Sequence, residues 1–204
     1  MFWGETLKKF APKSAAHFAA ASFLCTIMLL QPLYCFAQEQ DQLQLSAEKI
    51  EAGLIYNFLK YTEWPPEKMA NSPSPLVVCI FGARDPFGGY LQPIEDRTVH
   101  QREVKLIHIS SKEEAARCHM LFIGEDVASQ WPALHDFLAN QSVLTVGDFK
   151  GFSETGGMIE FNTEDNRIQI WLNIQAVNKA RLHIHDSLRR LARLTHLSST
   201  GGTE

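Results

Sequence analysis

The sequence predicts an α/β fold: a single three-layer domain with a mostly parallel sheet, flanked by helices and ending in an antiparallel C-terminal hairpin. The first observation is a series of short apolar runs of strand length that alternate with short helical patterns, which is typical of a parallel sheet covered on both faces. The second is the stretch 156–174, where apolar and polar side chains alternate on both sides of the polar link 163–166. Period-two alternation around a turn indicates a half-buried hairpin.

Residues 1–37 are predicted to be a secretory signal peptide rather than part of the fold. Three lysines form a positive start, an apolar stretch covers 15–30, and residues 35–37 offer a small-x-small cleavage site. The apolar stretch is short for the ~20 residues that a membrane helix needs, so an uncleaved anchor is the lesser alternative. We therefore expect an exported protein.

Cleavage would leave one domain over residues 38–197, followed by a small, polar tail over residues 198–204 that we expect to be disordered. The leader holds three lysines and one glutamate, so its removal changes the net charge from −4 to −6. An acidic domain without a basic cluster facing aromatic side chains is a poor binder of nucleic acid, and we exclude that class.

The first predicted element of the domain is a helix from Ser46 to about Tyr61. Pro65 and Pro66 end it, because proline lacks the backbone N–H and restricts the residue before it. The apolar residues of this helix are expected to share one face at helical spacing. They are Ile50, Leu54, Ile55, Phe58 and Tyr61.

The remaining elements follow in a regular order. We expect strands over 76–81, 104–109, 118–123 and 142–146, helices over 112–117, 131–138 and 175–180, and the two hairpin strands within 158–174. The last predicted element is an amphipathic helix over 184–195, with Arg189, Arg190 and Arg193 outside its apolar face.

Two cysteines, Cys79 and Cys118, remain after the leader is removed. In an oxidising compartment an even pair indicates one disulfide, and closing a loop of this length would stabilise the fold by roughly 3–4 kcal/mol. The alternative is two buried free thiols, each acting as a small hydrophobe in a strand. Export favours the disulfide.

The sequence contains no catalytic, cofactor-binding or metal-binding motif, so we expect a protein that is not an enzyme and carries no cofactor. The HExxH, GxSxG and phosphate-loop patterns are absent. Cys118 and His119 are neighbours in a predicted strand and should point to opposite faces. His183 and His185 would align as metal ligands only in an extended segment, and no third ligand lies nearby in the sequence.

Five stretches together resemble the YfiR-like family of exported bacterial proteins. They are AGLIYNFLKYTEWP, LVVCIFGARDPFG, CHMLFIG, VLTVGDFKGFSETGGMIEF and DNRIQIWLNIQAVNKARLHIHDSLRRLAR, and they span Ala52 to Arg193. The order of these motifs is more specific than any one of them. Cys79 and Cys118 lie where a family cysteine pair lies. Ser153 and Glu160 are found in the region of a second pair that some members have.

The resemblance implies a compact α/β domain in the periplasm and a regulatory, non-enzymatic role. It implies binding to the periplasmic sensor domain of an inner-membrane diguanylate cyclase that is held inactive, which lowers cyclic-di-GMP and biofilm formation. It also implies an outer-membrane, peptidoglycan-binding lipoprotein that sequesters the regulator and releases the cyclase. Homodimers are a further expectation from the resemblance.

Trp171 breaks the hairpin pattern, because it is a large aromatic on the polar side. It also departs from the family, where a charged residue is common. One interpretation is a patch covered by a neighbouring helix or loop. The other is a partner-binding surface formed with Arg189, Arg190 and Arg193, since exposed aromatics and arginines concentrate at interfaces.

A second class of function is a periplasmic small-molecule sensor. Open α/β sheets usually bind ligands at the carboxyl ends of their parallel strands. There the DPFG stretch over 85–88 and the pair Gly147 and Asp148 would line a pocket. Both classes, repressor and sensor, are compatible with the sequence.

Overall fold

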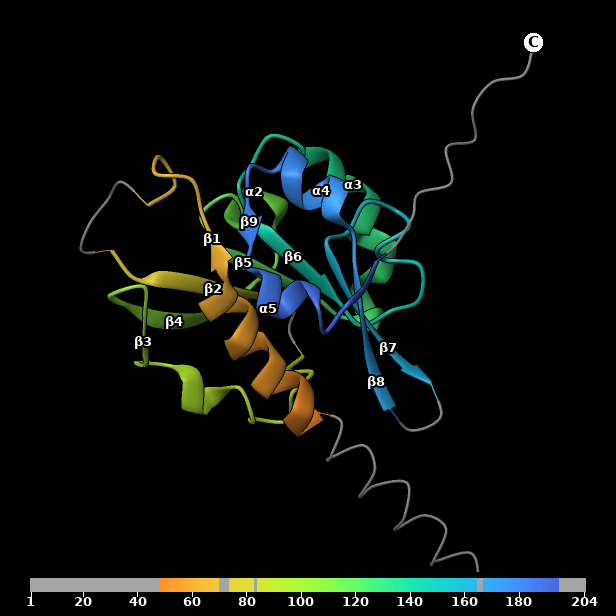
Figure 1. Ribbon diagram of the computed structural model, residues 1–204, viewed down its shortest axis with the longest axis horizontal. Helices are drawn as coiled ribbons and strands as arrows, with labels where there is room; N and C mark the ends of the chain where they lie inside the picture. Colours follow the sequence, from red (N-terminus) through yellow and green to blue (C-terminus); the bar gives the residue numbers. More distant parts are fainter. Residues whose placement is uncertain (1–47, 70–73, 83, 165–166, 195–204) are drawn as a thin grey trace, which may run out of the picture. The chain divides into compact units, whose positions relative to one another are not determined.

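A central sheet organises residues 48–69, 74–82, 84–164 and 167–194, the part of the chain that this computed structural model describes. Its eight described strands are β2 (Leu76–Phe81), β3 (Thr98–Val99), β4 (Arg102–Ile109), β5 (Met120–Ile123), β6 (Leu144–Gly147), β7 (Ile159–Glu164), β8 (Arg167–Leu172) and β10 (Arg193–Leu194). Their order across the sheet is β10-β8-β7-β6-β5-β2-β4-β3 (Figure 1). The predicted signal peptide, the expected helix start at Ser46 and the predicted tail lie outside the described residues.

The sheet is mostly parallel, as the sequence predicts. The neighbouring pairs β7–β6, β6–β5, β5–β2 and β2–β4 are parallel, and β10 pairs in parallel with β8. The predicted hairpin is the antiparallel pair β7 and β8, in which Phe161 lies opposite Ile170 and Glu160 lies opposite Trp171. At the far edge β3 pairs antiparallel with β4. The predicted α/β class with an antiparallel C-terminal hairpin is confirmed.

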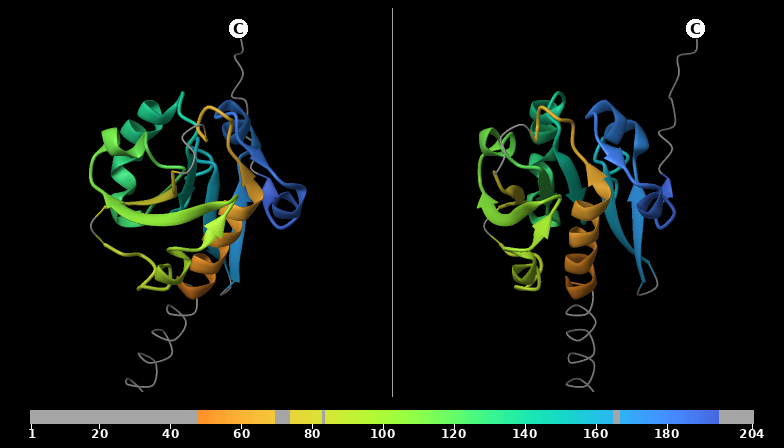
Figure 2. Two further views of the ribbon diagram at one scale, coloured as in Figure 1. Left: turned by 90° about the vertical axis from the view of Figure 1, so that its left-hand side faces the viewer. Right: turned by 60° about the vertical axis from the view of Figure 1, so that its left-hand side comes forward.

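Helices cover both faces of this sheet (Figure 2). One face packs against the N-terminal helix, described over 48–61, together with α4 (Ile174–Lys179), α5 (Asp186–Arg189) and the small ladder of β1 (Thr62–Glu63) with β9 (His183–Ile184). The other face packs against α2 (Lys112–Ala115) and α3 (Trp131–Leu138). Two 3₁₀ turns, Gln92–Ile94 and Glu125–Gln130, complete the described helical segments.

Strand β2 shows how the two layers arise from one apolar run. Val78 and Ile80 lie in the core that contains Phe58 of the N-terminal helix, whereas Cys79 and Phe81 lie in the core that contains Leu134 of α3. Successive side chains of a strand point to opposite faces, so a strand covered on both sides needs an unbroken apolar sequence. The run LVVCIF meets that need.

The buried face of the N-terminal helix differs from the prediction. Ile50, expected in the core, is 55% exposed. The fully buried stripe instead runs through Ala52, Ile55 and Leu59, at helical spacing, with Phe58 beside it. Apolar residues occupy two sides of this helix, and periodicity alone does not tell which side the sheet will cover.

The predicted helix over 184–195 is wrong. Its start lies in β9, its middle is the single turn of α5, and its end is β10. Leu191, an apolar residue in the middle of this segment, is 68% exposed, whereas an amphipathic helix would be expected to bury it. Residues distant in sequence keep much of this segment from forming a helix. The N–H of His185 donates a hydrogen bond to the Tyr61 carbonyl oxygen (2.9 Å), and Arg193 pairs as a strand residue with Trp171 of β8. Such tertiary pairing overrides a local helical pattern.

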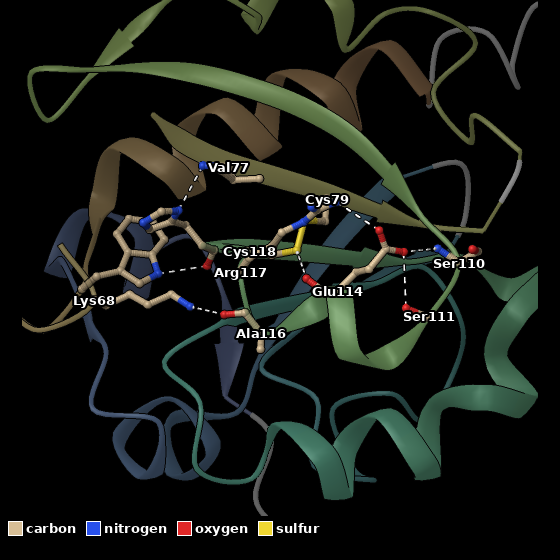
Figure 3. Close-up of a disulfide and its surroundings, with 11 residues drawn as sticks. Lys68, Val77, Cys79, Ser110, Ser111, Glu114, Ala116, Arg117 and Cys118 are labelled. Atoms are coloured by element: carbon tan, nitrogen blue, oxygen red, sulfur yellow. Dashed lines mark hydrogen bonds and ion pairs between the residues drawn. A yellow bond between two sulfur atoms is a disulfide. The ribbon is translucent and has the colours of Figure 1, made fainter. Parts of the chain in front are cut away.

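Cys79 and Cys118 form a disulfide inside the sheet (Figure 3). Cys79 lies in β2 and Cys118 lies two residues before the neighbouring strand β5, with 5.9 Å between their Cα atoms. Both are fully buried in the core beneath α2 and α3. The disulfide therefore links the middle of β2 to the segment that leads into β5.

The imidazole of His119, the residue after Cys118, is buried and forms a hydrogen bond with the backbone of the sheet. Its Nδ1 accepts a hydrogen bond from the N–H of Val77 (3.0 Å), and its carbonyl oxygen accepts one from Trp64 Nε1 (2.9 Å). Burial, together with the smaller effect of the nearby positive charges of Lys68 and Arg102, lowers the pKa of His119 to about 4. The ring is therefore neutral at neutral pH.

The disulfide leads to a prediction about stability. Replacing Cys79 or Cys118 by Ser is expected to lower the free energy of unfolding by about 2–4 kcal/mol, because the unfolded chain regains the entropy of an open loop. Urea unfolding of the unreduced protein measures this. The double Cys→Ser variant is the control, since reductant should not weaken it further. Complete alkylation of both thiols in unreduced protein taken from the periplasm would contradict the bond.

His119 leads to a second prediction, about pH. The unfolded chain binds a proton at His119 near pH 6.5, whereas the folded chain binds it only near pH 4, so stability is lost as the pH falls between these values. Asn in place of His119 keeps an acceptor for Val77 and cannot titrate. Relative to His119→Asn, the wild type should lose on the order of 2 kcal/mol across this window in urea unfolding. Parallel pH curves for the two proteins would show the prediction to be wrong.

Candidate partner-binding surface

Trp171 lies on the face of β8 that points away from the N-terminal helix. Its neighbours Ile170 and Leu172 enter the core on the helix side, so Trp171 projects to the opposite side. It is half-buried, and its indole Nε1 is buried without a hydrogen-bond partner among the described residues. Trp171 is thus neither covered completely nor fully open to solvent.

Arg193 completes this surface from the edge of the sheet. Strand β10 places Arg193 beside Trp171, and the guanidinium carbon lies 5.7 Å from the centroid of the indole ring. This geometry is a cation–π contact. Arg193 was expected on a helix, and it is the strand β10 that brings it to Trp171.

The other two predicted arginines lie on α5 and the turn that follows it. Arg189 ends α5 and its Nη1 lies 3.6 Å from Asp186 Oδ1, one turn earlier. Arg190 follows and is exposed. Of the four residues expected at a partner surface, the structure shows contact between Trp171 and Arg193 only.

Glu160 joins hairpin strand β7 to the loop that precedes it, a contact that the sequence does not predict. It lies opposite Trp171 on β7 and is 4% exposed. Its carboxylate accepts hydrogen bonds from the Ser153 N–H (2.8 Å), the Ser153 hydroxyl (2.7 Å) and the Gly151 N–H (3.3 Å). A buried carboxylate needs such donors. The sequence signal for it is a single acidic residue between the apolar residues Ile159 and Phe161.

A cavity of about 210 Å³ lies between α3 and α4. Its apolar lining includes Trp131, Leu138 and Met158, and its polar lining includes His135 and Lys179. Gly156 also lines the cavity with a positive φ of 99°, and a Cβ there would lie 2.5 Å from His135 Nε2, so only glycine fits.

The position of this cavity differs from the expected one. It is lined by Val143 and Met158, which directly precede β6 and β7, so it lies at the amino ends of these strands. The DPFG stretch and the pair Gly147 and Asp148 do not line it. The expected position at the carboxyl ends is therefore wrong for this cavity.

His183 and His185 lie in the extended geometry that would align them, but His185 serves as the cap of a helix. His183 is exposed on β9, and His185 caps α5 by accepting a hydrogen bond from the Ser187 N–H (3.3 Å). The described residues contain no group of three or more His, Cys, Asp or Glu side chains arranged to hold a metal ion. None of the described helices has the length and apolar character needed to cross a membrane.

Comparison with solved structures finds a partial likeness to one described as "the ABC domain in complex with L-Trp from Streptococcus pneumonia". The TM-score is 0.43 and the sequence identity 9%, with 61% of this chain and 56% of that chain covered. The protein thus spans little more than half of that chain.

Comparison with protein families finds a match along nearly the whole described domain. The model of the YfiR/HmsC-like family aligns with residues 48–193, a range that includes the sheet, the disulfide and the surface of Trp171 and Arg193. The protein belongs to the YfiR/HmsC-like family of periplasmic regulators that act in diguanylate cyclase signalling.

Proposed function

We propose that this protein is a periplasmic repressor that binds the periplasmic domain of an inner-membrane diguanylate cyclase and holds the enzyme inactive. The family match over residues 48–193 carries this proposal. The disulfide is compatible with an exported protein, since such bonds persist in oxidising compartments. Repression would lower cyclic-di-GMP and biofilm formation, and an outer-membrane, peptidoglycan-binding lipoprotein would relieve it by binding the repressor.

The contact with the cyclase is proposed to form at Trp171 and Arg193. The indole offers apolar area with little rotamer entropy to lose, and it is steadied by the guanidinium above it. Arginine presents forked N–H donors that suit a carboxylate, so the matching surface on the cyclase should carry an apolar side chain beside an acidic one.

A second copy of the chain competes for the same region. Strand β10 pairs only with residues 171 and 172 of β8, so the rest of that edge, 167–170, has no neighbouring strand among the described residues. An open strand edge is a template for pairing with another chain. The homodimer is therefore proposed to use this edge.

The cavity between α3 and α4 supports a second candidate function, the sensing of a small molecule. Its apolar walls would bury part of such a molecule, and Lys179 with His135 would meet an acceptor group. A compound that co-purifies with the protein at stoichiometric amount and is lost from Lys179→Ala would favour this function.

Deletion of the gene should raise cyclic-di-GMP and biofilm, because the cyclase loses its repressor. Deleting the cyclase as well should abolish the rise, and this double deletion is the control for an indirect effect. Nucleotide extraction with mass spectrometry measures the change. An unaltered nucleotide level in the single deletion would exclude the repressor function.

Trp171→Ala tests the surface. If Trp171 is a binding residue, the change should weaken binding to the cyclase domain by about 2 kcal/mol or more while leaving the melting temperature close to that of the wild type. Calorimetry of binding and thermal unfolding give the two values. Trp171→Phe, which keeps an aromatic ring, and Arg190→Ala, an exposed arginine nearby in sequence, are the matched controls.

Two results would count against this surface. One is a loss of roughly 3–5 kcal/mol of stability in Trp171→Ala, which would identify the indole as a core side chain. The other is full affinity for both the cyclase domain and a second copy. Sedimentation of Trp171→Ala separates the two partners, because only the loss of self-association would change its mass in solution.

A further inference from the structure

The cavity between α3 and α4 has an apolar interior and a polar mouth. Short side chains leave room for it, because Ala139 after α3 and Ala176 and Ala180 on or after α4 line a space that longer aliphatic side chains would fill. The buried apolar walls are Trp131, Leu138, Val143 and Met158. The volume of about 210 Å³ corresponds to about seven water molecules, so a molecule of about eight non-hydrogen atoms fits.

Hydrogen bonds fix the walls of this cavity before any ligand enters. Asn173, which is fully buried, caps α4 by accepting from the Ala176 N–H (3.0 Å) and donates to the Ser153 carbonyl oxygen (2.8 Å). Thr145 Oγ1 accepts from the Met158 N–H (3.2 Å), and the hydroxyl still has its own hydrogen to donate. A cavity with preformed walls needs little ordering when a ligand binds.

The mouth of the cavity carries a positive charge, although the protein as a whole is acidic. Gln175 and Lys179 lie one turn apart on α4, and both side chains are exposed. Lys179 forms no ion pair with a described residue. His135 is less suited to an anion, because its Nδ1 lies 3.4 Å from Asp136 Oδ1. Among the described residues that line the cavity there is no aspartate or glutamate.

We propose that this cavity binds a small molecule with one apolar chain or ring and one anionic group, such as a short-chain carboxylate. The inference rests on the second candidate function, the sensing of a small molecule. The apolar part lies against Trp131, Leu138 and Met158, and the anionic group meets Lys179 and the Gln175 amide at the mouth. An amino acid fits less well, because no carboxylate of the lining meets its ammonium group.

Titration of the full mature protein with hexanoate tests this site. Hexanamide and hexylammonium keep the same chain and replace the anion by a neutral and a cationic group. Calorimetry should show saturable binding of hexanoate and at least about fivefold weaker binding of the other two compounds, since hydrogen bonds to charged groups are the stronger kind. In two-dimensional NMR, the indole N–H signal of Trp131 should move during the hexanoate titration, because this ring lines the cavity.

Two variants locate the binding. Lys179→Met keeps a long side chain without its charge, so hexanoate should bind at least about fivefold more weakly while hexanamide binds as it does to the wild type. Ala176→Leu adds aliphatic bulk to the lining, so both compounds should bind more weakly. The matched control is Lys112→Met, which removes an exposed charge on α2 and should keep the wild-type affinity.

Three results would overturn the proposal. The first is a lack of saturable hexanoate binding, or binding that leaves the Trp131 signal unmoved. The second is equal affinity of the wild type and Lys179→Met for hexanoate. The third is a preference for hexanamide or hexylammonium, which would make the anionic class wrong and leave the sensing function in place. If Ala176→Leu does not fold, Lys179→Met decides, because it changes an exposed side chain.

Discussion

The fold depends on the complete enclosure of β2. It has a parallel neighbour on each edge, β4 and β5, so its backbone groups are paired along the strand. Its side chains enter a core on each face, and apolar burial on both sides is the main source of free energy for the domain. The disulfide acts at this same point. It joins β2 to the segment that leads into β5. It thereby fixes β5 beside β2, and β6 and then the hairpin follow β5 in the sheet.

The hairpin has one apolar face, which packs on the core, and one face that carries polar residues and Trp171. Partner binding is proposed for the second face. Ile170 and Leu172 hold β8 on the core, which leaves Trp171 on the far side. Glu160, the cross-strand neighbour of Trp171, joins β7 to the loop at Gly151 and Ser153 by hydrogen bonds. Hydrogen bonds that hold the strand beside a half-buried aromatic would lower the entropy that binding removes, and that is the physical reason to propose a partner contact here.

Buried titratable groups give the domain two opposing responses to pH. His119 is neutral because its ring is inside the sheet beside positive charges, so acid weakens the fold at that point. Burial raises the pKa of Glu51 to about 7 and the pKa of Asp148 to about 6, so these two carboxyls favour the folded state more in acid.

The sequence by itself determined the fold class, strand β2, helix α3 and the hairpin, because their periodicity and length are written into local residue patterns. It also indicated the Cys79–Cys118 pair and the unusual place of Trp171. Tertiary structure decided the rest. Segment 183–194 became two short strands around one helical turn because β1 and β8, distant in sequence, supply its hydrogen-bond partners. The contact of Arg193 with Trp171 and the raised pKa values of Glu51 and Asp148 exist only after folding, since both depend on burial and on neighbours that no local pattern contains.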